Sequence, residues 1–253
     1  MKVDKNAVKG AINRVFTACE DRGSLPRMPA FVTDYTEYPE LEALEEHYPL
    51  VRAECLALLD RKDDLTDVKA LGGNYTAGGI HTIRWKSYML KCGSFVRENC
   101  ARCPETTALL ERVPGLFTAF FSILEPRQYI RPHWGYYKGF VRYHLAVVIP
   151  NDNANNECWL RIQTDPRANA TRDIGAIEGG EKHYWRNGKG FFFDDTYLHD
   201  AANDSDQLRV VLWLDLVRRN GPAWLRVFNQ ACVAIAAQDG SVRNVRKNAV
   251  VTL

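Results

Sequence analysis

Five short segments in the second half of the chain constrain its fold most. Each is rich in β-branched and aromatic residues and is bounded by Gly, Pro, Asn or Asp, as β-strands typically are. The segments occupy residues 115–126, 139–150, 157–163, 189–195 and 208–217. Because no helical pattern stands between them, they predict a mainly β fold, either an antiparallel sandwich or a jelly-roll barrel.

Helical patterns flank this β-rich part. Apolar or aromatic residues at steps of three and four predict one helical stripe, made of Leu41, Leu44, Tyr48, Val51, Cys55 and Leu58. Residues 103–113 predict a short helix that stops near Pro114 and Gly115. Residues 221–237 return to helical spacing through Trp224, Phe228, Cys232 and Ile235. We expect this last helix to cover a sheet, with a helix lying on a membrane surface as the alternative.

Length and composition favour a single domain. With 253 residues and 46% hydrophobic composition, the chain can bury a full core. We expect one domain over residues 1–253, with a mostly helical part at 1–110, a β core at 115–218 and a C-terminal helix and tail at 219–253.

Charge and cysteine usage exclude several classes of protein. The net charge of +2 argues against a nucleic-acid-binding protein, which usually carries a concentrated basic excess. No run of apolar residues is long enough to span a membrane, and the first ten residues lack a signal-peptide core, so we expect a cytoplasmic protein. Seven scattered cysteines indicate reduced thiols. Cys100 and Cys103 form a C-x-x-C without the second pair that a structural zinc site needs.

The alternation of strand residues places polar side chains on one face. Phe140, Arg142 and His144 project together, because alternate residues of a strand share a face. Near the end of the β-rich part, Leu208, Val210, Leu212, Leu214 and Leu216 form a core face. Arg209 begins the opposite face. A buried arginine needs a paired anion, which either a protein or a ligand carboxylate could supply.

Two histidines open or close strands in this region. His133 and His199 are each followed, at a modest interval, by a strand arginine, Arg142 or Arg209. A lone histidine is more often a hydrogen-bonded structural residue than a metal ligand. The repeated arrangement favours a site that combines a metal with a carboxylate, and leaves the structural reading open.

Four linked motifs carry a resemblance to a known family. "PHWG", "RYHLAVVIP", "FDDTYLH" and "LRVVLWLDL" follow one another in this order. With them the chain resembles the aspartyl/asparaginyl β-hydroxylases, which are iron(II)- and 2-oxoglutarate-dependent oxygenases with a double-stranded β-helix fold. The resemblance is strong from about Trp85 to Arg218 and weaker over the N-terminal helices.

The resemblance assigns roles to individual residues. His133 and His199 would be the iron ligands, and Arg209 would bind the distal carboxylate of 2-oxoglutarate, as a planar guanidinium can through two hydrogen bonds. Ser122 and His144 would be further contacts to the cosubstrate. Arg142 would face the substrate or cosubstrate, beside Phe140 and Trp134 in the substrate pocket.

One position departs from the wider oxygenase pattern. Non-haem iron oxygenases usually add a carboxylate to two histidines, two residues after the first one, but here that residue is Gly135. The resemblance implies that water fills this place and that a nearby acid, Asp195, steadies it as part of the catalytic set. Halogenases also lack this carboxylate, although the surrounding motifs favour a hydroxylase.

The substrate stays open between two classes. We expect hydroxylation of an unactivated C–H bond, first at the β-carbon of an aspartyl or asparaginyl type of side chain, free or in a peptide. The family's peptide hydroxylases carry a second arginine where this chain has Phe140. "WKSYMLKCG" and "FVRYHL" also resemble the lipid A acyl-chain 2-hydroxylases, so an acyl chain or a specialised metabolite is the alternative.

Two further classes remain as alternatives. A zinc hydrolase could use His133, His144 and His199, since three histidines suit catalytic zinc. A non-catalytic jelly-roll binding protein would account for the strands and one arginine, but gives no reason for His133, Asp195, His199 and Arg209 to occur together.

Overall fold

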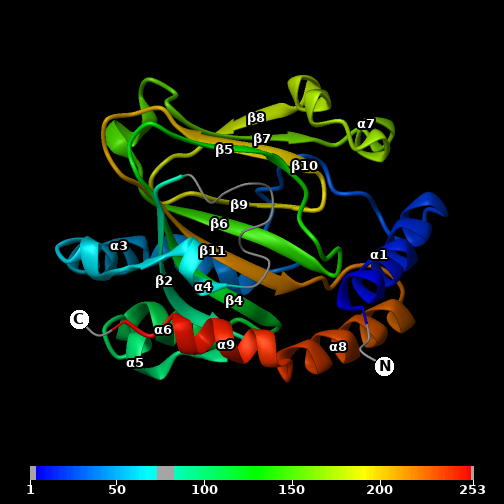
Figure 1. Ribbon diagram of the computed structural model, residues 1–253, viewed down its shortest axis with the longest axis horizontal. Coiled ribbons are helices and arrows are strands. Elements are labelled where there is room, and N and C mark those ends of the chain that lie inside the picture. The colour runs from blue at the N-terminus through cyan, green and yellow to red at the C-terminus, as the bar shows by residue number, and fades with distance from the viewer. Residues whose placement is uncertain (1–3, 73–82, 252–253) are drawn as a thin grey trace.

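Two antiparallel sheets face each other and form a double-stranded β-helix core with flanking helices (Figure 1). The computed structural model describes residues 4–72 and 83–251. The seven-stranded sheet has the order β1-β2-β4-β11-β6-β9, with β3 beside β2, and the four-stranded sheet has the order β5-β10-β7-β8. This architecture confirms the predicted mainly β fold.

The elements have the following bounds. The strands are β1 Thr66–Asp67, β2 Trp85–Cys92, β3 Ser94–Phe95, β4 Leu116–Leu124, β5 Gln128–His133, β6 Phe140–Val148, β7 Cys158–Gln163, β8 Glu181–Tyr184, β9 Gly190–Phe193, β10 Leu198–Asn203 and β11 Arg209–Val217. The helices are α1 Lys5–Asp21, α2 Glu42–Glu46, α3 Tyr48–Leu59, α4 Val68–Leu71, α5 Arg97–Cys100, α6 Pro104–Glu111, α7 Pro166–Thr171, α8 Ala223–Ala237 and α9 Gly240–Asn248. Short 3-10 turns are η1 Pro39–Leu41, η2 Lys62–Asp64, η5 Pro150–Asn153 and η6 Ile174–Gly179.

The outer face of the seven-stranded sheet carries the larger core. Val210, Leu212, Leu214 and Leu216 of β11 are fully buried there, and Leu208 packs against them, as the alternation predicts. Residues of α2, α3 and α6 complete this cluster. Burial on the outer face leaves the other side of β11, beginning with Arg209, to face the four-stranded sheet.

Apart from the half-buried Tyr48, the predicted stripe from Leu41 to Leu58 is buried, but three elements share it. The chain breaks between α2 and α3 at His47, whose backbone leaves helical geometry. Pro49 follows in the first turn of α3, where its missing N–H costs no hydrogen bond. The break lets both short helices lay their apolar residues on the same sheet.

The sheet begins earlier in the chain than the strand pattern indicates. Trp85–Cys92 forms β2 inside the seven-stranded sheet, although residues before 110 were expected to be mostly helical. Both faces of β2 are covered, so its sequence does not alternate cleanly between apolar and polar residues. The assignment of residues 1–253 to one oxygenase domain stays a prediction.

The C-terminal helix α8 confirms the predicted element but not its expected packing. Leu225 and Asn229 are its buried residues, whereas Trp224 and Ile235, which define the helical spacing, are exposed. α8 packs mainly through Leu225 against Phe16 and Leu25, beside α1, rather than flat on a sheet. None of the described helices is long and apolar enough to cross a bilayer.

Candidate active site

Two histidines from different strands meet at one end of the four-stranded sheet. His133 ends β5, His199 lies near the start of β10, and the antiparallel pairing of these strands puts the two residues opposite each other. Their ring centroids are 4.2 Å apart. The register of one strand pair therefore brings together two side chains that are distant in the sequence.

Both imidazoles turn the same nitrogen toward the backbone. His133 Nδ1 lies 2.9 Å from the carbonyl oxygen of Arg131, and His199 Nδ1 lies 2.8 Å from that of Tyr197. Because a carbonyl oxygen only accepts, each Nδ1 donates its hydrogen, and each Nε2 keeps a lone pair for a metal ion. Burial lowers the pKa of both rings and so favours the neutral form that binds metals.

A cavity between the two sheets joins these histidines to the predicted cosubstrate residues. His133, His199, His144, Ser122 and Arg209 all line it. Much of the remaining wall is aromatic, with Trp85, Trp185, Phe193 and Trp213. Five of the residues singled out by the sequence therefore surround one space, between strands β4, β5, β6, β10 and β11.

Arg209 is buried in this cavity, and no carboxylate within residues 4–72 and 83–251 pairs with it. Its side chain is 2% exposed, and its Nε has no hydrogen-bond partner. The guanidinium carbon lies 4.6 Å from the centroid of the Trp185 ring. Burial lowers the pKa of Arg209 to about 10, and the nearby Cys158 offsets this only in part. A buried cation without a partner is costly, so the cavity is suited to an anionic ligand.

Other polar atoms around Arg209 also lack hydrogen-bond partners in the part of the chain that the structure describes. Both ring nitrogens of His144 are buried and unpaired, and burial together with the charges of Arg142 and Arg209 holds the His144 pKa well below its usual value. The Trp185 Nε1 is buried without an acceptor as well. Ser122 Oγ accepts from Trp85 Nε1 at 2.8 Å, which leaves the Ser122 hydroxyl hydrogen free to donate. Sequence reasoning missed Trp85 and Trp185, because a tryptophan carries no motif.

Arg142 does not face the cavity as expected. Its Nη1 lies 2.8 Å from Asp195 Oδ2, and its Nη2 lies 2.9 Å from Asp215 Oδ1, which also accepts from Nε. Asp215 is the residue opposite Arg142 in the pairing of β11 with β6. The guanidinium carbon sits 3.8 Å from the centroid of the Trp213 ring. The two carboxylates bind the Arg142 guanidinium and the indole covers it. This arginine is therefore not free to receive substrate, as had been expected.

Asp195 fills the space beside the unusual glycine. Gly135 N donates to the Asp195 carbonyl oxygen at 2.7 Å, and a Cβ built on Gly135 would overlap the Asp195 carboxylate. The missing side chain at position 135 is thus compensated by an acid from the other histidine-bearing segment. Burial raises the Asp195 pKa to about 6, against the opposing effect of Arg142.

The other two residues assigned to the substrate pocket lie away from the cavity. The Trp134 indole Nε1 donates to Asn169 Oδ1 at 3.1 Å, and its ring lies below the Arg172 guanidinium. Phe140 packs against Phe117 and Tyr137, with ring centroids 5.1 and 5.0 Å apart. Both side chains support the segment that follows His133, and neither lines the cavity.

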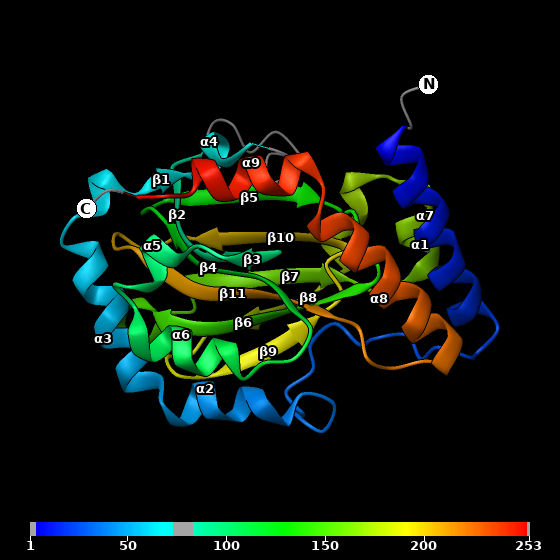
Figure 2. The same ribbon diagram turned by 90° about the horizontal axis from the view of Figure 1, so that it is seen from below.

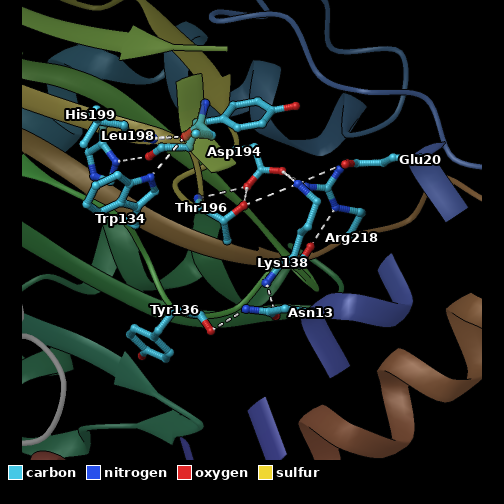
Figure 3. A network of polar contacts seen from close by, with 12 residues as sticks. Asn13, Glu20, Trp134, Tyr136, Lys138, Asp194, Thr196, Leu198, His199 and Arg218 are labelled. Atoms are coloured by element: carbon cyan, nitrogen blue, oxygen red, sulfur yellow. Dashed lines mark hydrogen bonds and ion pairs between the residues drawn. The ribbon is translucent and has the colours of Figure 1, made fainter. Parts of the chain in front are cut away.

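A buried polar network behind the histidines connects their two segments (Figure 3). Lys138 Nζ lies 3.1 Å from both Asp194 Oδ2 and Glu20 Oε1, and Arg218 Nη2 lies 2.7 Å from Asp194 Oδ2. These contacts join the segment after His133 to the turn before His199, to α1 and to the end of β11. The network thus ties together the segments that carry the histidine pair.

Asn169 of α7 forms a second link between these segments. Its Oδ1 accepts from Trp134 Nε1, next to His133, and from the backbone N–H of Leu198, next to His199, the latter at 2.7 Å. Its Nδ2 donates to the Gln163 carbonyl oxygen at 2.6 Å. No motif pointed to Asn169, because it lies in a short polar stretch far from either histidine in the sequence.

No third side chain that could bind a metal joins the histidine pair among the described residues. Within residues 4–72 and 83–251, no group of three or more His, Cys, Asp or Glu side chains is placed to hold a metal ion. The three-histidine zinc site therefore gains no support. Cys100 and Cys103 are buried in the outer core, and the Cys100 thiol donates to the Leu90 carbonyl oxygen.

Comparison with known proteins gives a consistent family. The family model described as aspartyl/asparaginyl β-hydroxylase matches residues 45–219. An ornithine lipid ester-linked acyl 2-hydroxylase from Rhizobium tropici is 33% identical over 188 residues, which is 74% of this chain and 60% of that protein. Human aspartyl/asparaginyl β-hydroxylase is 27% identical over 199 residues, which is 76% of this chain and 23% of that protein. The aligned region is thus less than two thirds of either relative.

Similarity to solved structures is more distant. A prolyl-4-hydroxylase from Pseudomonas putida aligns with 68% of this chain and 88% of its own, at a TM-score of 0.39 and 16% identity. The carbocyclase SnoK from nogalamycin biosynthesis, described as α-ketoglutarate dependent, aligns with 53% of this chain and 63% of its own, at a TM-score of 0.36 and 14% identity.

Proposed function

The chain belongs to the aspartyl/asparaginyl β-hydroxylase family, and we propose that it is an iron(II)- and 2-oxoglutarate-dependent hydroxylase. The observation that carries this proposal is Arg209, a buried guanidinium without a carboxylate in the same cavity as two neutral histidines. A dicarboxylate cosubstrate would supply the missing anion at Arg209 and extend toward a metal ion held by the histidines.

The residues of the cavity fit this metal and cosubstrate. His133 and His199 would hold iron(II) through Nε2, because each Nδ1 is committed to a backbone carbonyl. Two protein ligands leave coordination positions open for a chelating cosubstrate and oxygen. When bound, iron and 2-oxoglutarate supply the oxidation of an unactivated C–H bond by O₂, with conversion of the cosubstrate to succinate.

The protein itself supplies binding, orientation and exclusion of water. Arg209 would bind the far carboxylate of 2-oxoglutarate through parallel N–H donors, and the unpaired nitrogens of His144 and Trp185 offer further polar contacts. The aromatic wall leaves little room for bulk water around the reacting carbon. Asp195, held by Arg142, occupies the space that a side chain at position 135 would need, and would steady a water ligand there.

Two substrate classes fit this site, and one observation favours the second. An aspartyl or asparaginyl type of side chain, oxidised at its β-carbon, agrees with the family. Recognition of an acidic substrate would need a free cation, but Asp195 and Asp215 occupy Arg142, and Phe140 is apolar. These contacts favour an uncharged substrate segment such as a fatty acyl chain. The relative from Rhizobium tropici is named as an acyl 2-hydroxylase, which agrees with that choice.

Anaerobic titration of the purified metal-free protein with iron(II) and 2-oxoglutarate tests the proposal. Chelation should produce a weak visible charge-transfer band in the wild type. His133→Ala and Arg209→Met should lose it, whereas the matched control His183→Ala should keep it, because His183 packs on Phe191 outside the cavity lining. Succinate release on admitting O₂ would then be measured with acyl and peptide substrates in parallel.

Two results would contradict the proposal. One is the absence of any band from folded wild-type protein. The other is a band that survives in Arg209→Met at the same 2-oxoglutarate concentration, because the buried guanidinium would then have no role in binding the anion. Hydrolytic activity with zinc but not iron would return the histidines to the zinc reading.

A further inference from the structure

The outward side of α8 exposes an unusual amount of apolar surface. Trp224, Val227 and Ile235 are 57%, 66% and 74% exposed. With the exposed Ala231 and Ala234 they lie on one side of the helix, which we call the α8 face. Amphipathic helices normally turn such a side toward the core, so a continuous apolar face in water indicates a surface that binds something.

Basic side chains lie next to this face mainly on α9, since helical spacing puts Arg226 on another side of α8. α8 and α9 follow one another across the underside of the molecule (Figure 2). Neither helix contains Asp or Glu. Residues 223–248 hold four basic residues, Arg226, Arg243, Arg246 and Lys247, and one acidic residue, Asp239, which gives a net charge of +3. This exceeds the +2 of the whole chain, so the rest of the protein is slightly acidic by comparison.

The buried side of α8 contacts the segment that carries His133. Asn229 Nδ2 donates to the Gly139 carbonyl oxygen at 2.8 Å, and Asn229 Oδ1 accepts from the Tyr137 hydroxyl at 2.7 Å. Figure 1 shows α1, α7 and α8 at the same end of the two sheets. α8 is therefore anchored to the segment that follows His133, through the side of the helix opposite the α8 face.

We propose that the α8 face docks this protein onto the surface of anionic lipid bilayers. Aliphatic side chains would enter the boundary between headgroups and acyl chains, and Trp224 would lie at the level that tryptophan prefers. The basic residues would contact the anionic headgroups. Docking itself does not depend on the chemistry in the cavity. Its use, to bring an acyl substrate to the histidine pair, rests on the proposed function.

Net charge favours an anionic bilayer over a second copy of this chain as the binding partner of the α8 face. A symmetric dimer through the α8 face would place the two α8–α9 pairs, each with a net charge of +3, against one another. Like charges at close range oppose such a contact. An anionic bilayer complements both the apolar residues and the charge.

Flotation of the whole metal-free chain with lipid vesicles tests the docking. The wild type should bind vesicles of equal parts phosphatidylcholine and phosphatidylglycerol, and bind pure phosphatidylcholine less. Combining Trp224→Ser, Val227→Ser and Ile235→Ser should reduce the partition coefficient about tenfold or more, since three apolar side chains lose their burial. Arg243→Gln with Lys247→Gln, both exposed, should reduce it about tenfold on the phosphatidylglycerol vesicles only.

A matched control separates docking by the α8 face from non-specific adsorption through other exposed apolar side chains. Leu50→Ser with Ile174→Ser removes apolar side chains that are 44% and 57% exposed elsewhere on the surface, and should leave vesicle binding unchanged. Circular dichroism melting of each variant checks folding. The proposal is overturned if the wild type does not bind the vesicles, or if the triple variant binds them as well as the wild type. It is also overturned if the only effect of the triple substitution is to convert a dimer of the protein to a monomer.

The experiments distinguish a failure of the docking proposal from a failure of the proposed chemistry. Trp224, Val227 and Ile235 do not line the cavity, so the triple variant should keep the charge-transfer band with iron(II) and 2-oxoglutarate. Loss of vesicle binding with an intact band supports docking by the α8 face. A wild type that floats but shows no band would contradict the proposed chemistry and leave the docking in place.

Discussion

Two groups of buried charged residues in the β-helix core differ in whether their cations are paired with carboxylates. Behind the histidines, Arg218, Lys138 and Arg142 each meet a carboxylate, from Asp194, Asp195 or Asp215. Between the sheets, Arg209 lies among aromatic rings, unpaired nitrogens and Cys158, and no carboxylate of the described residues pairs with it. Burial alone therefore does not identify a functional arginine.

The difference is visible in the pKa values of the arginines. Burial opposes ionisation in all of them, but the pKa of Arg218 and that of Arg142 end above their usual value because Asp194, Asp195 and Asp215 outweigh it. The pKa of Arg209 ends below its usual value, since no carboxylate outweighs burial. We call the first cluster the closed cluster, made of Lys138, Arg142, Arg218 and their carboxylates. Arg209 and the cavity around it form the open cluster.

Breaking the closed cluster should have the largest effect on stability. Arg218→Met would leave Asp194 fully buried with Lys138 as its remaining cation, and should lower the free energy of unfolding by about 3–5 kcal/mol. Urea unfolding followed by circular dichroism measures this. Arg127→Met, which removes a fully exposed pair with Asp206, should have a far smaller effect, because solvent screens that pair. Equal losses in the two variants would remove the structural role assigned to the closed cluster.

The same change in the open cluster should act in the opposite direction. Arg209→Met removes a buried charge that has no partner, so the free energy of unfolding should stay the same or rise, by up to about 1–4 kcal/mol. The stabilisation that 2-oxoglutarate and iron(II) give the wild type, about 2.7 kcal/mol at a hundredfold excess over Kd, should disappear. Thermal unfolding with and without both ligands checks the two effects together. A loss as large as that of Arg218→Met would mean that the two clusters do not differ.

The sequence predicts the open cluster better than the closed one. The face of Arg209 follows from the alternation of its strand, whereas Ser122 and His144 were assigned through the family resemblance. The partners of Arg142 do not follow, because Asp215 is reached only through the register of β11 with β6, and Asp195 lies in a turn. Strand β10 was not predicted either, because its sequence LHDAAN has little preference for strands.

Gly135 tests how tightly the closed cluster confines the histidines. Gly135→Ala would place a Cβ in the space of the Asp195 carboxylate and should lower the free energy of unfolding by about 1–3 kcal/mol. In an Asp195→Ala background the same change should cost less, with a remainder from contact with the backbone oxygen of residue 195. A double-mutant cycle from urea unfolding gives the coupling between the two positions. Additive effects would show that the carboxylate does not occupy this space.

The adjacent acids Asp194 and Asp195 provide the smallest and most specific test. Arg218 and Lys138 outweigh burial and lower the Asp194 pKa to about 2, whereas burial prevails at Asp195 and raises its pKa to about 6. A carboxyl whose pKa is higher in the folded than in the unfolded protein binds its proton more tightly when folded. Its contribution to stability is therefore fully present below the unfolded value near 3.8 and is lost as the pH rises through about 6.

Asp195→Asn should remove a downward slope in the free energy of unfolding of at most about 1.4 kcal/mol per pH unit between pH 4 and 6. Asp194→Asn should keep a downward slope but end it at a lower pH, because Asp194 is ionised here and its charge helps to raise the Asp195 pKa. Urea unfolding at several pH values measures both slopes in the metal-free protein. If Asp195→Asn left the slope between pH 4 and 6 as it is in the wild type, Arg142 would hold Asp195 ionised as firmly as Arg218 holds Asp194, and the carboxyl beside Gly135 would belong to a cluster with no proton to exchange.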